Sequence, residues 1–466
     1  MEIWPWKART RYWLFLGRRK IKQKRYQEAL KYFEKVIRAE PASSFALAQA
    51  GFCFGELRRH DEAIDAYQGA LQRAPLYGDV HAYLAQMYSR VGRNQEAYDS
   101  LHRAFRAKPK LQGNPYWLQV VGNVCLRLER WEEAGTAFQK IAESEKSNDD
   151  AWLGLGISLG NLKRWQEALE AFQRMAQLNV NNGNAWHGVG WASAHLNCDA
   201  EAVVALERAI ELDGQNAAAH RELGETYFKL HQFKEAVKQF QEYIRLKPND
   251  PAGHHSLGMA YCEMEEFGLA VEPFSEALRL GPEFAEVYHT LGLVYSELGL
   301  HEKAAVAFQN AIRLEPQNAG YNCRLASSLL HLERRAESIQ AATEALRLKP
   351  DSGDAYSLLG CSLHEPATLS EAVAAYQKSL ELNPEQFEAL ANLGDACLQL
   401  GRTEEARDAL IQARNIRSND PKLHHLLGEV YLKLGMRAEA YREHEILSRL
   451  DRTLADALAK SLDNSS

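Results

Sequence analysis

Sixteen histidines are the residues of this chain best suited to chemistry, because a neutral imidazole is the commonest metal ligand in proteins. Two adjacent pairs, His254-His255 and His424-His425, invite a metal site. Consecutive residues of a helix point about 100° apart, so neither pair can hold one ion by itself. The zinc motif HExxH does not occur, since His301-Glu302 and His444-Glu445 lack the second histidine. We therefore predict no metal site.

The cysteines indicate neither a disulfide framework nor a zinc site, because they are seven in number, widely scattered and without a CxxC pair. They are Cys53, Cys125, Cys198, Cys262, Cys323, Cys361 and Cys397. Free thiols fit a reducing compartment. The longest apolar run near the N-terminus, residues 12–17, is shorter than the core of a secretory signal. We expect a cytoplasmic protein.

Motifs of nucleotide-dependent enzymes are missing as well. The chain has no GxGxxG and no Walker A segment, so nothing marks a dinucleotide or a nucleotide phosphate site. No segment approaches the run of about 18 apolar residues that a membrane-spanning helix needs. We predict no catalytic residue, no cofactor and no enzymatic activity.

Charge is distributed unevenly along the 466 residues. The net charge is −7, yet residues 1–110 hold 21 lysines and arginines against 11 acidic residues. The remainder is therefore strongly acidic. A nucleic acid that follows the whole chain would need a continuous positive stripe, so we do not expect a nucleic-acid partner.

Prolines recur at a fixed interval of 34 residues, which is the mark of a repeat protein. They are Pro41, Pro75 and Pro109, and then Pro248, Pro282, Pro316, Pro350 and Pro384. The gap between the two series is 139 residues, which is four periods plus three. The frame therefore continues through the middle with one insertion, which the glycine positions place at residues 112–114.

Each unit has the pattern of two helices. When the proline is counted as residue 32 of the unit, residue 8 is glycine or alanine in thirteen units and residue 20 is alanine in all but one. In the first helix, bulky residues occupy one face around the small residue, as Tyr288, Leu291 and Tyr295 show. In the second helix, Phe308 is an example of the bulky residue near the alanine. Glycines such as Gly299 fall where the first helix must end. Small residues at two fixed places predict two helices in close contact.

This unit resembles the tetratricopeptide repeat, whose small residues at 8, 20 and 27 and proline at 32 it matches over residues 10–452. The resemblance implies an all-α solenoid, a right-handed superhelix of about thirteen helix-turn-helix units. The expected parts are a basic and aromatic lead-in (1–9), three units (10–111), the insertion (112–114), ten units (115–452) and a C-terminal cap and tail (453–466). Pro273, inside a second helix, and the insertion are expected to disturb the stack.

The resemblance also implies a use, because the first helices of this family line an inner, concave wall along which peptides lie. In the sixth to ninth units the wall positions hold His187, Trp191, Arg221, Glu225, Phe228, His255, Met259 and His289. These aromatic, methionine and histidine side chains could hold a peptide. The alternative is ordinary packing between neighbouring first helices. The family's clamp for carboxylate tails and its asparagine ladder do not carry over, since Gly154 and Gly188 stand at two of the required places.

The N-terminal segment is a second candidate surface. Its aromatic residues Trp4, Trp6, Trp13 and Phe15 stand among the basic residues Arg9, Arg11, Arg18, Arg19, Lys20, Lys22, Lys24 and Arg25. Basic and aromatic residues together suit an anionic membrane face or an acidic protein, and this patch alone could also contact a nucleic acid. The alternative is that Trp13 and Leu16 pack the first unit while the charges keep its edge soluble.

The sequence therefore predicts a non-catalytic scaffold or adaptor that binds partner proteins or peptides and assists complex assembly. The alternative is a peripheral membrane tether or assembly factor that docks through the N-terminal segment. Self-association is compatible with either function. Partner identity and pathway do not follow from this pattern, because family members share the frame and differ in their wall residues.

Overall fold

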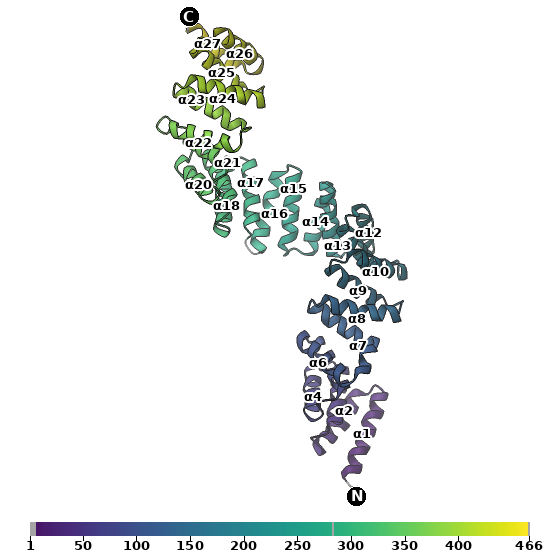
Figure 1. Cartoon of the computed structure of the whole chain (residues 1–466). Coiled ribbons are helices and arrows are strands. Elements are labelled where there is room, and N and C mark those ends of the chain that lie inside the picture. Colours follow the sequence, from purple (N-terminus) through teal and green to yellow (C-terminus); the bar gives the residue numbers. More distant parts are fainter. Residues whose placement is uncertain (1–5, 282–283, 465–466) are drawn as a thin grey trace. The chain divides into compact units, whose positions relative to one another are not determined.

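The computed structural model describes residues 6–281 and 284–464. Over these residues the chain forms 27 α-helices and one short 3-10 helix, with no strand. Figure 1 shows the helices following one another along the chain. The predicted all-α repeat solenoid is confirmed. Trp4 and Pro282, which the sequence analysis used, lie outside the described residues.

Contacts divide the chain into a first body, Met1–Gln232, and a second body, Phe233–Ser466, and each is described by itself. The first body holds α1 (Trp6–Lys22), α2 (Tyr26–Ala39), α3 (Ser44–Glu56), α4 (His60–Arg73), α5 (Gly78–Arg90), α6 (Asn94–Ala107), η1 (Pro109–Gly113), α7 (Pro115–Arg127), α8 (Trp131–Ser144), α9 (Asp149–Asn161), α10 (Trp165–Leu178), α11 (Gly183–His195), α12 (Asp199–Leu212) and α13 (Ala217–Lys229). The second body holds α14 (Phe233–Leu246), α15 (Pro251–Glu263), α16 (Phe267–Leu280), α17 (Ala285–Glu297), α18 (His301–Leu314), α19 (Ala319–His331), α20 (Arg335–Leu348), α21 (Gly353–Ser362), α22 (Leu369–Leu382), α23 (Phe387–Gln399), α24 (Thr403–Ile416), α25 (Pro421–Lys433), α26 (Arg437–Leu450) and α27 (Arg452–Asn464).

An aromatic ring of the second helix of a hairpin lies directly against a glycine of the first. Phe172 of α10 is 1% exposed, and a Cβ atom built on Gly156 of α9 would lie 2.6 Å from its ring. The same ring meets α11 of the next hairpin, where a Cβ atom on Gly188 would lie 2.3 Å away. Side-chain carbons do not approach one another this closely, so the ring fits because both places are glycine.

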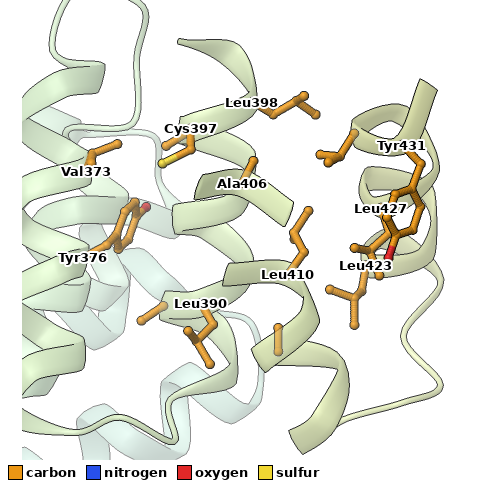
Figure 2. Packing of buried hydrophobic residues seen from close by; sticks show 14 of the residues in the cluster. Val373, Tyr376, Leu390, Cys397, Leu398, Ala406, Leu410, Leu423, Leu427 and Tyr431 are labelled. Atoms are coloured by element: carbon orange, nitrogen blue, oxygen red, sulfur yellow. The ribbon is translucent and has the colours of Figure 1, made fainter. Parts of the chain in front are cut away.

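This contact recurs in both bodies. Phe138 lies between Gly122 and Gly154, and a Cβ atom on either glycine would come within 2.5 Å of the ring. In the second body Leu410 of α24 takes the place of the ring against Gly394. Figure 2 shows Leu410 within the buried cluster that joins α22, α23, α24 and α25. The small residue predicted at place 8 of the unit thus leaves room for a large side chain that packs directly against it.

A hydrogen bond ties the fourth residue of many hairpins to the turn before it. The ring N–H of Trp152 donates to the Lys146 carbonyl at 3.0 Å, and His81 Nε2 lies 2.8 Å from the Pro75 carbonyl oxygen. The carbonyl of each of these two turns thereby gains a hydrogen-bond partner. Histidine also occupies this place in other units, as His220, His254 and His424, and these three residues are buried or half-buried.

At the C-terminal end this hydrogen bond is part of a buried ion pair. His424 is 2% exposed, with Nε2 2.8 Å from the Ser418 carbonyl and Nδ1 2.5 Å from Glu443, itself 3% exposed. Both ring nitrogens face acceptors, so the ring satisfies both only as an imidazolium. Arg414 adds a contact of 3.0 Å to Glu443. The Glu443 carboxylate raises the pKa of His424, and the Ser418 carbonyl adds to the rise, against burial and Arg414.

Three segments depart from a regular stack of hairpins. The predicted insertion, residues 112–114, overlaps the end of η1, which contacts α6 and α7 and buries Leu111. Helix α16 continues through Pro273, which is buried within it. Helix α21 is only 10 residues long. Residues 363–368 form an irregular connection between α21 and α22. Whether Pro273 or the insertion acts as a hinge stays a prediction.

The last helix closes the hydrophobic core of the second body. Helix α27 packs on α25 and α26, and its Leu458 and Leu462 are buried. Leu458 fills the place next to Gly428 that a ring occupies in other hairpins. Within the described residues, no helix has both the length and the apolar character to cross a bilayer.

Replacing the shared glycine should loosen the stack. We expect Gly188→Ala to lower the free energy of unfolding by about 1–3 kcal/mol, because the new methyl group overlaps the Phe172 ring. The matched control is Gly268→Ala, also within a helix but with open space around it, which should stabilise by up to about 1 kcal/mol through helix propensity. Urea unfolding followed by circular dichroism measures both changes, and equal midpoint shifts would contradict the steric account.

The buried pair should make stability depend on pH. Because the pKa of His424 is raised on folding, its stabilisation is present below the ordinary value of about 6.5 and is lost as pH rises through the folded value. As pH rises above about 6.5 we therefore expect the urea midpoint of the parent protein to fall, and that of His424→Gln to stay flatter. His254→Gln, at the equivalent place beside the Pro248 carbonyl, should keep the parent slope. Identical slopes in all three proteins would disprove the assignment.

Candidate functional site

The eight residues predicted to line a concave wall fall into two sets, one in each body. His187 and Trp191 lie on α11, and Arg221, Glu225 and Phe228 lie on α13, all in the first body. His255 and Met259 lie on α15 and His289 lies on α17, all in the second body.

In the first body, α11 and α13 enclose a hollow of about 340 Å³. Its walls include Trp191, His195, Arg221, Glu222, Glu225 and Lys229. The structure thus brings together three of the predicted residues, Trp191, Arg221 and Glu225. His187 and Phe228 are half-buried on the same two helices without lining this hollow.

Trp191 is held firmly at the edge of the hollow. Its ring lies edge-on to Trp165 of α10 with centroids 5.0 Å apart, and it also meets Phe172 at 6.3 Å. Gly160 leaves room for it, since a Cβ atom there would lie 2.3 Å from the indole. His195 stacks on the other ring, Trp165, at 3.9 Å. Trp191 is half-buried, so it packs against its neighbours and still faces the hollow.

Charges of both signs line the wall. Arg221 lies 3.8 Å from Glu225 and 3.7 Å from Glu222, while Lys229 contacts Asp199 at 3.0 Å. The Glu225 side chain is 56% exposed, yet the surrounding wall partly desolvates its carboxylate and raises its pKa. Arg221 opposes this rise and Glu222 adds to it. A partly desolvated carboxylate favours an added cation, and so would gain from a basic group of a ligand.

In the second body the predicted residues pack on their own hydrophobic cores. His255 lies edge-on to Phe274 with centroids 5.7 Å apart, and His289 contacts Tyr321 at 5.0 Å. Burial lowers the pKa of both histidines. Met259 packs against the cluster that contains Phe274. These three residues are half-buried.

A second hollow, in the second body, was not predicted from the sequence. It encloses about 480 Å³ between α19, α21 and α23, and its walls include Arg324, Ser327, Lys349, Asp354, Ser357 and Glu388. Arg417 pairs with Glu388 at 3.1 Å. Its residues Arg324, Ser327, Asp354, Ser357 and Glu388 stand at places 2, 5, 6 and 9 of three consecutive units. Polar residues stand at these places in other units as well, so the sequence carried no signal that marks this hollow.

One serine stands in the spacing GxSxG, a pattern of nucleophilic hydrolases, within residues 156–160. That pattern requires a sharp turn between a strand and a helix, whereas Ser158 lies inside α9. Ser158 is fully buried and donates to the Gly154 carbonyl at 2.7 Å. Its hydroxyl is therefore part of the helix packing and does not face a substrate site.

The predicted basic patch lies on the first helix and the turn after it. Arg9, Arg11, Arg18, Arg19, Lys20 and Lys22 belong to α1, and Lys24 and Arg25 precede α2. Trp13 and Leu16 are half-buried, as expected if they pack the first hairpin. Phe15 points the other way and is 61% exposed.

The sequence matches three family models, each described as tetratricopeptide repeat. One matches residues 200–259 and 367–430, another 16–78 and 121–181, and the third 285–318 and 319–352. No curated protein sequence matches this chain.

Several solved structures are similar. YrrB, described as a TPR protein with an unusual peptide-binding site, is 21% identical over 40% of this chain and 96% of its own, with a TM-score of 0.38. MamA is 24% identical over 35% of this chain and 90% of its own, with a TM-score of 0.33. The APC/C hetero-tetramer Cut9–Hcn1 is 14% identical over 98% of this chain and 96% of the matched chain, with a TM-score of 0.43.

The family models together match more than half of the chain and occur in both bodies. Helical hairpins of this kind serve generally as non-catalytic scaffolds for protein interaction. The repeated helix pair, the packing of large side chains against glycines and the family models lead to one conclusion, that this chain belongs to the tetratricopeptide-repeat family.

Proposed function

We propose that this protein is a scaffold or adaptor that binds a peptide segment of a partner protein in the hollow between α11 and α13. The observation that carries the proposal is the meeting of Trp191, Arg221 and Glu225 around one cavity of about 340 Å³. Small-molecule pockets start at about 300 Å³, so a hollow of this size suits one or two side chains of a peptide.

Trp191 would serve as the apolar contact for the peptide. Trp165 and Phe172 pack against the indole and limit its motion. A large ring that is already fixed loses little conformational entropy on binding, which is why tryptophan dominates many interfaces. We therefore expect an aromatic or aliphatic side chain of the peptide to lie on Trp191.

The charges would fix the direction of the peptide. Arg221 and Lys229 are cationic, and Glu222 and Glu225 are anionic, all within the same wall. Complementary charges across an interface determine register and partner choice more than raw affinity. Because the Glu225 carboxylate is partly desolvated, we expect a basic residue of the peptide opposite it.

The cellular setting is part of the proposal. All seven cysteines are free thiols. Burial raises the pKa of Cys53 and of Cys125 to about 12, so these two thiols stay protonated and unreactive. Free thiols throughout support a protein that works in the reducing cytoplasm and holds complexes together without disulfides.

Exchanging the charges of the wall should weaken peptide binding. Arg221→Glu with Glu225→Arg keeps the net charge and the pair on α13 but reverses its direction. Peptides selected on the full-length protein from a phage-displayed random library should lose about tenfold or more in affinity for this variant, measured by fluorescence anisotropy.

The matched control is the same exchange at Arg208 and Glu211, an exposed pair 2.8 Å apart on α12 that does not line the hollow. It should leave the affinity unchanged. Equal affinity in both variants would remove this hollow as the binding site, and selection of no peptide at all would argue against peptide recognition by the protein.

A further inference from the structure

Helix α1 has one packed face and one uncovered face. It packs on α2 through Leu14, Gly17 and Ile21, and a Cβ atom on Gly17 would lie 2.7 Å from Phe33. On the opposite side of the helix, Arg11, Phe15 and Arg19 are exposed. Phe15, three residues after Tyr12, belongs to that side and is 61% exposed, and Tyr12 is 50% exposed.

The uncovered face is densely basic. Residues 6–25 contain nine lysines and arginines and no acidic residue. Among the described residues, the ion pairs made by this segment involve Lys20 and Arg25, both with Glu28. In the described part of the chain, Arg11, Arg19 and Lys22 make no ion pair, so they add to one positive field.

Aromatic and basic side chains alternate along this face. Arg11 and Tyr12 lie three to four residues before Phe15, and Arg19 lies four residues after it, so they share one helical stripe. Lys22 continues the stripe by one further turn. An exposed ring between cations is the arrangement of helices that lie in the interface of a bilayer.

We propose that the outer face of α1 binds the surface of an anionic lipid bilayer. The lipid phosphates would bind Arg11, Arg19 and Lys22, and the ring of Phe15 would enter the boundary between head groups and acyl chains. This site is independent of the hollow between α11 and α13, so the protein could hold a partner at a membrane without spanning it.

A bilayer fits this face better than a shaped macromolecule does. The cations stand on long, flexible side chains around one helix, which suits a diffuse and fluid layer of negative charge. A nucleic acid would need the basic track to continue, but α3 contains no lysine or arginine. Burying the exposed ring of Phe15 also requires an apolar region, which the bilayer boundary supplies.

Vesicle binding of the full-length protein tests this proposal. We expect flotation with phosphatidylcholine vesicles that contain phosphatidylglycerol and none with phosphatidylcholine alone. Neutralising Arg11, Arg19 and Lys22 to glutamine should lower the partition coefficient about a hundredfold, since each basic residue near such a surface contributes about fivefold. Phe15→Ser should lower it about tenfold at the same ionic strength, through loss of the inserted ring.

The matched control neutralises Lys31, Lys35 and Arg38 of α2, which are exposed basic residues of the same hairpin. It should retain most of the binding, and circular dichroism should show that all variants stay folded. An equal loss in the control, or equal binding to both kinds of vesicle, would overturn the proposal. Binding to heparin or to a second copy of the chain without vesicle binding would assign the face to those partners instead.

Discussion

The structure depends on a contact between a buried ring and two glycines. In the first body Phe172 of α10 lies against Gly156 of its own hairpin and against Gly188 of the next one. The ring fills the space between three helices, so it fixes the distance between α9 and α10 and also the position of α11. A hairpin whose apolar face is exposed buries too little surface to be stable alone. Through this contact the neighbouring hairpin packs on that face and buries it.

The candidate site is built directly on the same contact. Helix α10 carries Phe172 in the core and Trp165 at its first turn, and both rings touch Trp191 of α11. The position of Trp191 in the hollow is therefore set by the packing that joins the hairpins. Arg221 and Glu225 reach the hollow from α13, the first helix of the following unit. Recognition by this wall thus depends on the spacing of successive hairpins and not on a flexible loop.

The regular features could be predicted from the sequence because they are local and repeat. The interval of 34 residues and the small residues at two fixed places predicted the helix pairs, since a small residue leaves room for a large side chain, as Gly292 does for Phe308. The pairing of His424 with Glu443 could not be predicted, because the two residues lie on different helices and no spacing rule connects them.

The wall residues were only partly predictable for the same reason. His255 and His289 occupy the same place in their units as Arg221, yet they rest on Phe274 and Tyr321 and do not line the hollow around Arg221. Whether such a side chain packs or faces a ligand depends on the side chains of the next unit. The residue type at one place of the repeat does not reveal them. The basic helix α1 was visible in the sequence, but the direction of Phe15 required the structure.

Hydrogen exchange measured by mass spectrometry on Phe172→Ala tests the central contact most directly. Removing a buried ring of this size costs about 3–5 kcal/mol, and the account assigns that cost to both hairpins that meet at the ring. We predict faster amide exchange in α9, α10 and α11 together, with unchanged exchange in α25 and α26. Faster exchange confined to α9 and α10 would contradict the account, because it would mean that the ring does not hold the next hairpin in place.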